Sequence, residues 1–502
     1  MTLLLSYSLE DAISETKFGK FNYFIIVLSG LILACGMIET NSINLVIPIA
    51  SCELEMTNFH KGLLGSVGYI GIILASQLWG FLADTRGRKK IIVPALLFSF
   101  IFTILSTFMK NFWLLLVSRF LNGFCICGPQ TIIYAFLGEF HAEKNRARVL
   151  IVASVMYGIF CLINPINGIL FLNQNTWNIH IPLIDLNYNA WRIFLLMCSV
   201  PCVISALLMI FFVPESPKFT YAQGDEEKTL IILQRIHKFN TGRDDYKVTS
   251  LIRDKEFEDA SNQKPKSFLE FLWSQTAPLF KSPHLKNTLT ACYLQFGICV
   301  ACNGFWVFFP ELTNKVSLWL KEDPSHTTAT ICSIYSSFNK TISENLPSTC
   351  VTKLEIQTLA NTSILTFLYS FSWLLISIII NRTGKLIIIV FVSFLTGLAS
   401  ILLMFLEYPQ ASLYIYLIII LGGLNMSIVN ASTVELYPTT LRAMAVSISM
   451  MFGRVGSVVG SNFVGLLIKN FCTYTFILPA VLMITGGILA FTIPNINKKH
   501  KN

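Results

Sequence analysis

The segment GFLADTRGRKK, from Gly80 to Lys90, separates two stretches of the chain that carry almost no charge. A helix needs ~20 mostly apolar residues to cross the ~30 Å hydrocarbon layer of a membrane. The two neighbouring stretches, 62–83 and 91–109, both meet this requirement. The segment is therefore predicted to be a polar turn between two membrane-spanning helices.

The residue types within this turn suggest how it is built. Gly80 would let two helices approach closely, and Gly87 permits a tight turn because it has no Cβ. Asp84 can pair with Arg86 or Arg88, or can cap the N-terminus of a neighbouring helix. The alternative is a basic loop that only sets the orientation of the chain in the membrane.

The same length criterion predicts an all-α membrane protein with twelve spanning helices in two sets of six. The first set is 22–49, 62–83, 91–109, 112–137, 149–172 and 192–213. The second set is 287–309, 361–380, 386–405, 411–433, 443–468 and 471–494. The predicted parts are an N-terminal segment 1–21, a half 22–213, a loop 214–286, a half 287–494 with a long loop 310–360, and a tail 495–502.

The net charge of +9 follows from membrane topology and does not indicate a nucleic-acid partner. If the N-terminus is cytosolic, 27 of the 37 Lys and Arg residues fall in cytosolic segments and 8 in segments on the other side. Cytosolic loops of membrane proteins carry this excess of positive charge. Both termini are therefore expected in the cytosol. The protein itself is expected in either the plasma membrane or a vesicle membrane.

Two motifs recur along the chain, which indicates an internal repeat. Asp84 and Asn381 each precede by three residues a glycine that is followed by a basic residue, and they lie 297 positions apart. A glutamate followed seven positions later by an arginine also occurs twice, 296 positions apart, as Glu139/Arg146 and Glu435/Arg442. Repeated halves of this kind are a common transporter architecture.

Together these motifs resemble the major facilitator superfamily and its sugar-porter branch. The segment 80–90 resembles the family signature between helices 2 and 3, and PESPKF at 214–219 resembles the element that follows helix 6, with Lys218 in place of arginine. In that family such residues hold a cytosolic gate shut. The resemblance implies a gating role for Gly80, Asp84, Gly87, Arg88, Glu139, Arg146, Glu435 and Arg442.

Three further segments resemble the synaptic vesicle glycoprotein 2 group: GKFNY at 19–23, WGFLAD at 79–84 and GFWVFFP at 304–310. The long loop is much shorter here than in the vertebrate members of that group. The resemblance therefore implies a relative of the group, and a synaptic location does not follow from it.

The loops give three further expectations. Cys332 and Cys350 lie in the long non-cytosolic loop, where the environment is oxidising, and a disulfide between them is predicted. Asn339 begins a glycosylation sequon in the same loop. In the cytosolic loop, 225–238 is either a short amphipathic helix or a solvated linker.

Charged side chains inside a membrane are costly and usually functional or paired. Glu39, Arg119 and Arg454 lie within predicted spans and are candidates for contacts with a substrate or a proton; a buried structural ion pair is the alternative. Amides and an aromatic on helices 7 and 10 are further candidates, although they also suit helix packing. They are Asn303, Trp306, Asn425 and Asn430.

These features favour a transporter, secondary active or facilitative, that moves a small organic solute by alternating access, with a coupled proton as an option. The alternative is a vesicle-type membrane glycoprotein that acts as a receptor or scaffold without transport. Neither Gly19-Lys20 nor Gly384-Lys385 is followed by Ser or Thr, so no P-loop is present. No enzymatic motif, metal-binding spacing or cofactor site is recognised, and the expected partners are the lipid bilayer and the solute, with the protein as a monomer.

Overall fold

A computed structural model of the chain describes most of its 502 residues. The described residues are 6–173, 178–182, 185–252, 270, 273, 276–322, 328–336, 354–437, 439–468 and 471–492. Within them the chain is almost entirely helical, and eleven helical runs are long and apolar enough to span a membrane. A further long helix, α15, covers the predicted span 361–380.

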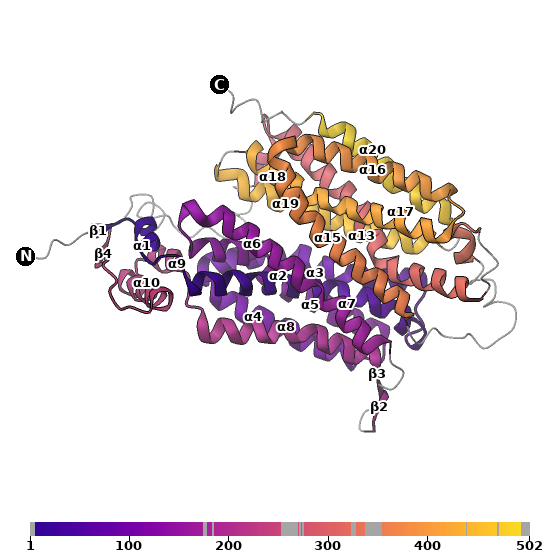
Figure 1. The fold of residues 1–502 in the computed structure, drawn as a ribbon, viewed down its shortest axis with the longest axis horizontal. Coiled ribbons are helices and arrows are strands. Elements are labelled where there is room, and N and C mark those ends of the chain that lie inside the picture. The colour runs from indigo at the N-terminus through magenta and orange to yellow at the C-terminus, as the bar shows by residue number, and fades with distance from the viewer. Residues whose placement is uncertain are drawn as a thin grey trace, which may run out of the picture.

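The first half of the bundle contains six helical runs, which cover the six predicted spans (Figure 1). They are α2 (Lys20–Glu53), α3 (Asn58–Arg86), α4 (Arg88–Thr107), α5 (Phe112–Glu139), α6 (Glu143–Cys161) with its continuation α7 (Ile163–Asn167) and η1 (Gly168–Leu172), and α8 (Ala190–Phe212).

The second half repeats this arrangement. Its helices are α13 (Leu285–Glu322), α15 (Ile356–Thr383), α16 (Lys385–Phe405), α17 (Pro409–Leu421) with η3 (Gly422–Leu424) and α18 (Asn425–Leu436), α19 (Thr439–Leu467) and α20 (Cys472–Ala490). The turns at Gly87 and Gly384 have φ values of 104° and 84°, a region that favours glycine. The repeat read from the sequence thus includes the same backbone turn in both halves.

Short helices and strands lie at the two ends of the bundle. At one end lie α1 (Leu9–Glu15), α9 (Pro217–Ala222), α10 (Glu226–Thr241) and a parallel pair formed by β1 (Ser6–Tyr7) and β4 (Ser250–Leu251); η2 (Ala277–Phe280) precedes α13. We call this the α10 end. At the opposite end, β2 (Asn178–Ile181) and β3 (Leu186–Asn189) form an antiparallel hairpin, and we call this the hairpin end (Figure 1).

Helices within each half pack closely through glycines. A Cβ on Gly71 would collide with the Phe120 carbonyl of α5, and one on Gly304 would lie 2.7 Å from the Gly460 carbonyl carbon of α19. Small residues bring helices this close, and dispersion and backbone contacts then replace the hydrophobic effect that is absent in lipid. Gly80 is different, because a Cβ there would meet no atom within 4 Å. The prediction that Gly80 supports close helix packing is therefore wrong for this conformation.

The two halves meet along α3 and α19, α2 and α13, and α6 and α15. Near the hairpin end the contact is tight: a Cβ on Gly62 would lie 2.8 Å from the Ser461 carbonyl oxygen, and one on Gly465 would lie 2.7 Å from the Asn58 carbonyl oxygen. Asn462 donates a hydrogen bond of 3.0 Å to the Ser66 hydroxyl across the same seam. The halves are therefore closed against each other at the hairpin end.

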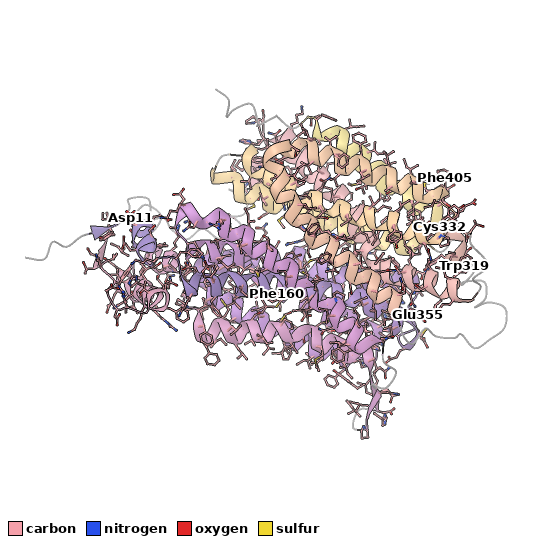
Figure 2. All side chains as sticks on the ribbon, viewed as in Figure 1. Asp11, Phe160, Trp319, Cys332, Glu355 and Phe405 are labelled. Atoms are coloured by element: carbon pink, nitrogen blue, oxygen red, sulfur yellow. A yellow bond between two sulfur atoms is a disulfide. The ribbon has the colours of Figure 1, made fainter. Side chains whose placement is uncertain are left out.

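The disulfide of Cys332 differs from the predicted one. Cys332 is bonded to Cys472 at the start of α20, with the two Cα atoms 5.6 Å apart, and it lies at the end of the bundle away from Asp11 (Figure 2). The prediction paired Cys332 with Cys350 because both lie in one loop, but tertiary packing brings a cysteine from 140 positions away into bonding distance. Cys52 is also disulfide-bonded. Cys350, Asn339 and the tail 495–502 lie outside the described residues.

Candidate functional site

A buried ion pair connects two helices of the first half. The Glu39 carboxylate on α2 lies 3.6 Å from the Arg119 guanidinium on α5, and the two side chains are 0% and 3% exposed. Two of the candidate charges therefore neutralise each other. Neither side chain is accessible to a solute in this conformation, which favours the alternative of a buried ion pair.

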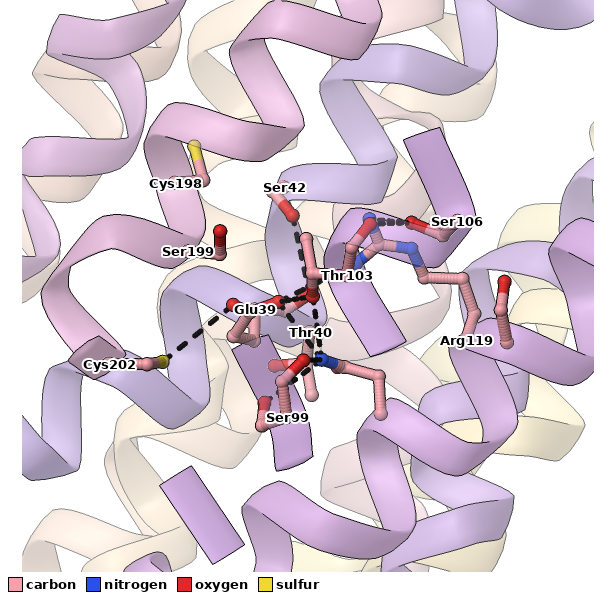
Figure 3. A network of polar contacts seen from close by, with 12 residues as sticks. Glu39, Thr40, Ser42, Ser99, Thr103, Ser106, Arg119, Cys198, Ser199 and Cys202 are labelled. Carbon is pink, nitrogen blue, oxygen red and sulfur yellow. Dashed lines mark hydrogen bonds and ion pairs between the residues drawn. The ribbon is translucent and has the colours of Figure 1, made fainter. Parts of the chain in front are cut away.

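Hydrogen bonds surround this pair (Figure 3). Glu39 accepts from Thr103 on α4 at 2.7 Å and from Asn122 at 3.1 Å, and the Cys202 thiol on α8 lies 3.7 Å from its other oxygen. Arg119 donates to the Ser106 hydroxyl at 2.9 Å, while its Nε has no hydrogen-bond partner. A charge buried here without its partner would be strongly unfavourable. The network thus fixes four helices of the first half around one neutral pair.

Arg454 on α19 has a different environment. It is partly buried and lies close enough to Tyr69 of α3, Cys127 of α5 and Cys299 of α13 for its charge to act on all three side chains. These neighbours come from both halves, so Arg454 faces the seam between them. Among the described residues, the carboxylates that form ion pairs do so with other basic side chains, and none pairs with Arg454.

Amides of the second half lie near this region. Gln295 donates to the Asn430 side-chain oxygen at 2.6 Å and to the Met426 carbonyl at 3.0 Å, and its own oxygen accepts no hydrogen bond. Asn303 donates to the Ser457 hydroxyl at 2.7 Å. These side chains join α13 to α18 and α19, and the side-chain oxygen of Gln295 is buried without a hydrogen-bond partner.

Asn425 does not belong to this group. It is fully buried and donates to the Ile389 carbonyl at 3.1 Å and the Ser393 hydroxyl at 3.0 Å, both on α16. Its amide therefore packs helices together inside the second half. In this conformation the helix-packing alternative describes Asn425.

Trp306 begins a row of aromatic rings on α13 and α15. Its ring centroid lies 5.9 Å from that of Tyr369 at 76°, and Tyr369 lies 6.5 Å from Trp373 at 67°. The Trp373 indole N–H has no hydrogen-bond partner. Edge-on rings of this kind present an apolar surface with polar edges.

The charged turn at the α10 end forms a network around Arg88. Its guanidinium lies 3.1 Å from the carboxylates of both Asp84 and Glu139, and it stacks over the Phe219 ring at 5.2 Å. The predicted pairing of Asp84 with Arg88 is therefore present. The cap on the next helix comes from another residue: Glu215 accepts from the backbone N–H of Lys89 at 3.0 Å, at the first turn of α4.

A second network at this end ties the N-terminal segment to the bundle. One oxygen of Glu10 accepts from Arg146 at 2.9 Å and from Lys218 at 2.6 Å. Burial acts to raise the pKa of Glu10, but the hydrogen bonds and charges of Lys218 and Arg146 outweigh it and hold the pKa below its usual value. Arg146 and Glu139 thus belong to neighbouring networks and do not pair with each other. The side chains of Glu435 and Arg442 lie outside the described set.

The family follows from a comparison of the whole chain. Residues 28–339 and 327–502 match the sequence model of the Major Facilitator Superfamily. The chain belongs to this superfamily. The xylose transporter XylE from E. coli has the same fold: its partially occluded inward-open structure matches with a TM-score of 0.63 and 13% identity over 95% of this chain and 100% of that one. Its inward-open structure matches with a TM-score of 0.65 over 94% and 95%.

Curated superfamily relatives include synaptic vesicle glycoproteins. Human synaptic vesicle glycoprotein 2B is 24% identical over 334 residues, which is 61% of this chain and 47% of that protein. Mouse synaptic vesicle glycoprotein 2C is 26% identical over 61% of this chain and 45% of that protein. The chain spans about half the length of these relatives. The comparisons confirm the fold and family expected from the motifs, and they identify the chain as a multi-pass membrane protein of a transporter family.

Several residues of these networks were not predicted from the sequence. Glu10 lies in a polar segment with several acids, and only the packing selects it. Glu215 belongs to the PESPKF element, but its hydrogen bond to the first turn of α4 was not predicted. Lys61 and Glu311 are separated by 250 positions, so no local pattern links them. Asn122 makes four short contacts around Glu39, which depend on the fold and leave no local signal in the sequence.

Proposed function

We propose that this superfamily member transports a small organic anion by alternating access of its two halves, with Arg454 as the residue that binds the negative charge. The proposal rests on the contrast between the buried charges. Glu39 and Arg119 neutralise each other inside one half, whereas Arg454 faces the seam without a carboxylate partner among the described residues. The site between the halves therefore carries net positive charge.

Arginine suits such a role because its guanidinium is always charged and binds carboxylates and phosphates through two parallel hydrogen bonds. Tyr69, the Gln295 oxygen and the Trp373 indole N–H supply polar groups, and Trp306 and Tyr369 supply apolar surface. A few polar groups among aromatic walls are typical of a small-molecule site. We therefore propose a solute with one acidic group and an apolar body.

The orientation belongs to the same proposal. We propose that the α10 end faces the cytosol, because the basic turn at 86–90 and the described part of the following loop, 214–252, lie there. The hairpin end, where the halves are closed, then faces the other side of the membrane. In this orientation the structure corresponds to the state in which the site is closed to the outside.

A thermal-shift screen of the purified protein tests the substrate class. Carboxylates, organic phosphates, organic cations, sugars and nucleosides are each added to the protein in detergent. A ligand that binds only the folded state raises the unfolding free energy by about 2.7 kcal/mol at 100 times its Kd. We expect stabilisation by an organic anion and none by cations.

Matched variants assign the effect to Arg454. Arg454→Gln is expected to abolish the anion-dependent shift, and Arg148→Gln, which removes an exposed arginine of α6, is expected to retain it. Uptake of the same anion into proteoliposomes then tests transport. Stabilisation by a cation, or an unchanged shift in Arg454→Gln, would contradict the role of Arg454. Binding without uptake would favour the receptor or scaffold alternative.

A further inference from the structure

An ion pair at the hairpin end crosses the seam between the halves. The Lys61 ammonium, in the first turn of α3, lies 2.8 Å from the Glu311 carboxylate on α13. The same carboxylate oxygen lies 3.2 Å from Lys315, one turn further along α13. Glu311 is therefore held by one lysine from the opposite half and one from its own helix.

The three side chains are largely removed from solvent. Glu311 is 6% exposed, Lys61 11% and Lys315 18%. Buried ion pairs gain little over apolar packing, yet breaking one leaves an uncompensated charge and is strongly unfavourable. A second lysine on Glu311 changes this balance, because the carboxylate keeps a partner when Lys61 moves away. The cluster can therefore separate without leaving the acid alone.

Tyr335 covers the cluster from the segment 328–336. Its hydroxyl donates to Glu311 at 3.4 Å, and the Lys315 ammonium lies 3.5 Å from the centre of its ring. Cys332, three positions earlier, is bonded to Cys472 of α20, which belongs to the same half as Glu311. The segment 328–336 is thus fixed covalently to the second half. It would stay in contact with Glu311 when the two halves separate.

No other ion pair joins the two halves within the part of the chain that the structure describes, since the remaining pairs lie inside one half or in the α10-end segments. The surrounding contacts across the seam come from small residues and uncharged polar groups. A Cβ on Gly65, for example, would lie 2.5 Å from Val307 Cγ1, and Asn462 donates to Ser66. Within the described residues the cluster is therefore the contact across the seam that carries charge.

We propose that Lys61 and Glu311 form a latch that holds the hairpin end closed, and that Lys315 keeps Glu311 paired when the latch opens. The proposal rests on the proposed alternating-access function, in which this end must open once in each cycle. Lys61 and Lys315 thus have different roles at one carboxylate. Only Lys61 ties the halves together, whereas Lys315 stabilises the acid in both states.

Accessibility of a cysteine at Val307 tests the latch in the full-length protein in detergent. The Val307 side chain is buried against Gly65 of the opposite half, so a Val307→Cys thiol becomes reactive toward a maleimide only when the hairpin end opens. The parent protein without this substitution gives the background from its native cysteines. We expect Lys61→Gln to raise the labelling rate at Val307→Cys at least about tenfold, since it removes one partner of a buried interfacial charge pair.

Lys315→Gln is the matched control. It removes the other lysine from the same carboxylate without cutting a contact between halves, so the labelling rate is expected to stay within about twofold of the parent carrying Val307→Cys. Equal rates in the two lysine variants, or an unchanged rate in Lys61→Gln, would overturn the latch. Size-exclusion elution and thermal unfolding of each variant identify a misfolded protein. Such a protein would also show increased labelling of its native cysteines.

The labelling experiment does not depend on the substrate. If Lys61→Gln opens the hairpin end while no anion binds, the latch stands and the proposed substrate is wrong. If an anion is transported while neither lysine variant changes the labelling, the function stands and the latch is wrong.

Discussion

The Glu39 carboxylate on α2 and the Arg119 guanidinium on α5 lie 3.6 Å apart inside the first half, 80 positions from each other in the chain and buried from solvent. The pair is neutral overall, so neither charge is available to bind a solute while the pair is intact. Because these two charges neutralise each other, Arg454 is the candidate charge that is left to bind a solute. The first two predictions concern the Glu39–Arg119 pair.

Removing one member of this pair should destabilise the protein more than removing both. Arg119→Gln leaves Glu39 buried without a counter-charge, at a cost of about 3–5 kcal/mol. The double variant Glu39→Gln/Arg119→Gln replaces the pair by two amides and should recover most of this loss. Thermal unfolding in detergent measures both. A double variant as unstable as the single one would show that the two side chains do not act as a pair.

Glu39→Gln should also flatten the pH dependence of transport if this carboxyl is the proton site. Thr103 and Asn122 still find a hydrogen-bonding partner in the amide, but Arg119 loses its counter-charge, so size-exclusion chromatography and thermal unfolding first establish that the variant is folded. Uptake is measured from pH 5.5 to 7.5 in proteoliposomes, with Glu407→Gln, an exposed acid before α17, as the control. An unaltered pH profile in Glu39→Gln would leave Glu39 with a structural role only.

The two acids that hold Arg88 should differ in their effect on stability. Asp84 is 69% exposed and Glu139 13%, although each lies 3.1 Å from Arg88. An exposed pair contributes less than about 1 kcal/mol, so Asp84→Asn should leave the unfolding temperature nearly unchanged. Glu139→Gln should lower it, because Arg88, which is 17% exposed, loses the more buried of its two carboxylate partners. Equal shifts would contradict this difference in burial.

Asp84→Asn should instead act on the gate at the α10 end. If Asp84 helps to hold that end shut in the opposite conformation, its loss should raise the labelling of a cysteine placed at this end. A labelling rate equal to that of the parent would remove the gating role given to Asp84. The measurement is separate from the stability comparison, which reports only on the present conformation.

Acid should release the N-terminal segment from the bundle. The pKa of Glu10 is lowered from its ordinary value of 4.5 in the folded protein, so its ion pairs stabilise the folded state fully above pH 4.5. That contribution is lost as the pH falls through the lowered folded-state pKa. The protection factor of α1 against hydrogen exchange, which corrects for the pH dependence of the intrinsic rate, should therefore fall below pH 4.5, and Glu10→Gln should show the lower protection already at pH 7. A protection factor that is independent of pH and equal in both proteins would contradict the role of Glu10.

The Cys332–Cys472 bond should appear in a non-reducing peptide map as one cross-linked pair of peptides. Because it closes a loop of 140 positions, its removal should lower the unfolding free energy by about 2–5 kcal/mol. Cys472→Ser tests this by thermal unfolding. A peptide that joins Cys332 to any other cysteine would overturn the pairing.

The sequence by itself determined the number and order of the spanning helices, the repeat and the family. These features are local: a run of apolar residues must become a helix in lipid, because every backbone polar group needs a partner there. The turn at Gly87 and the pairing of Asp84 with Arg88 could be predicted for the same reason, since both partners lie within one turn of chain.

Only the tertiary structure decided which charges are neutralised and which remain available. Arg119 and Arg454 look alike in the sequence, yet one meets Glu39 and the other faces the seam. Cys332 and Lys61 likewise find partners 140 and 250 positions away. Such pairings depend on how helices rotate and pack against each other, and the energies that fix this packing are summed over the whole bundle and leave no local pattern in the chain.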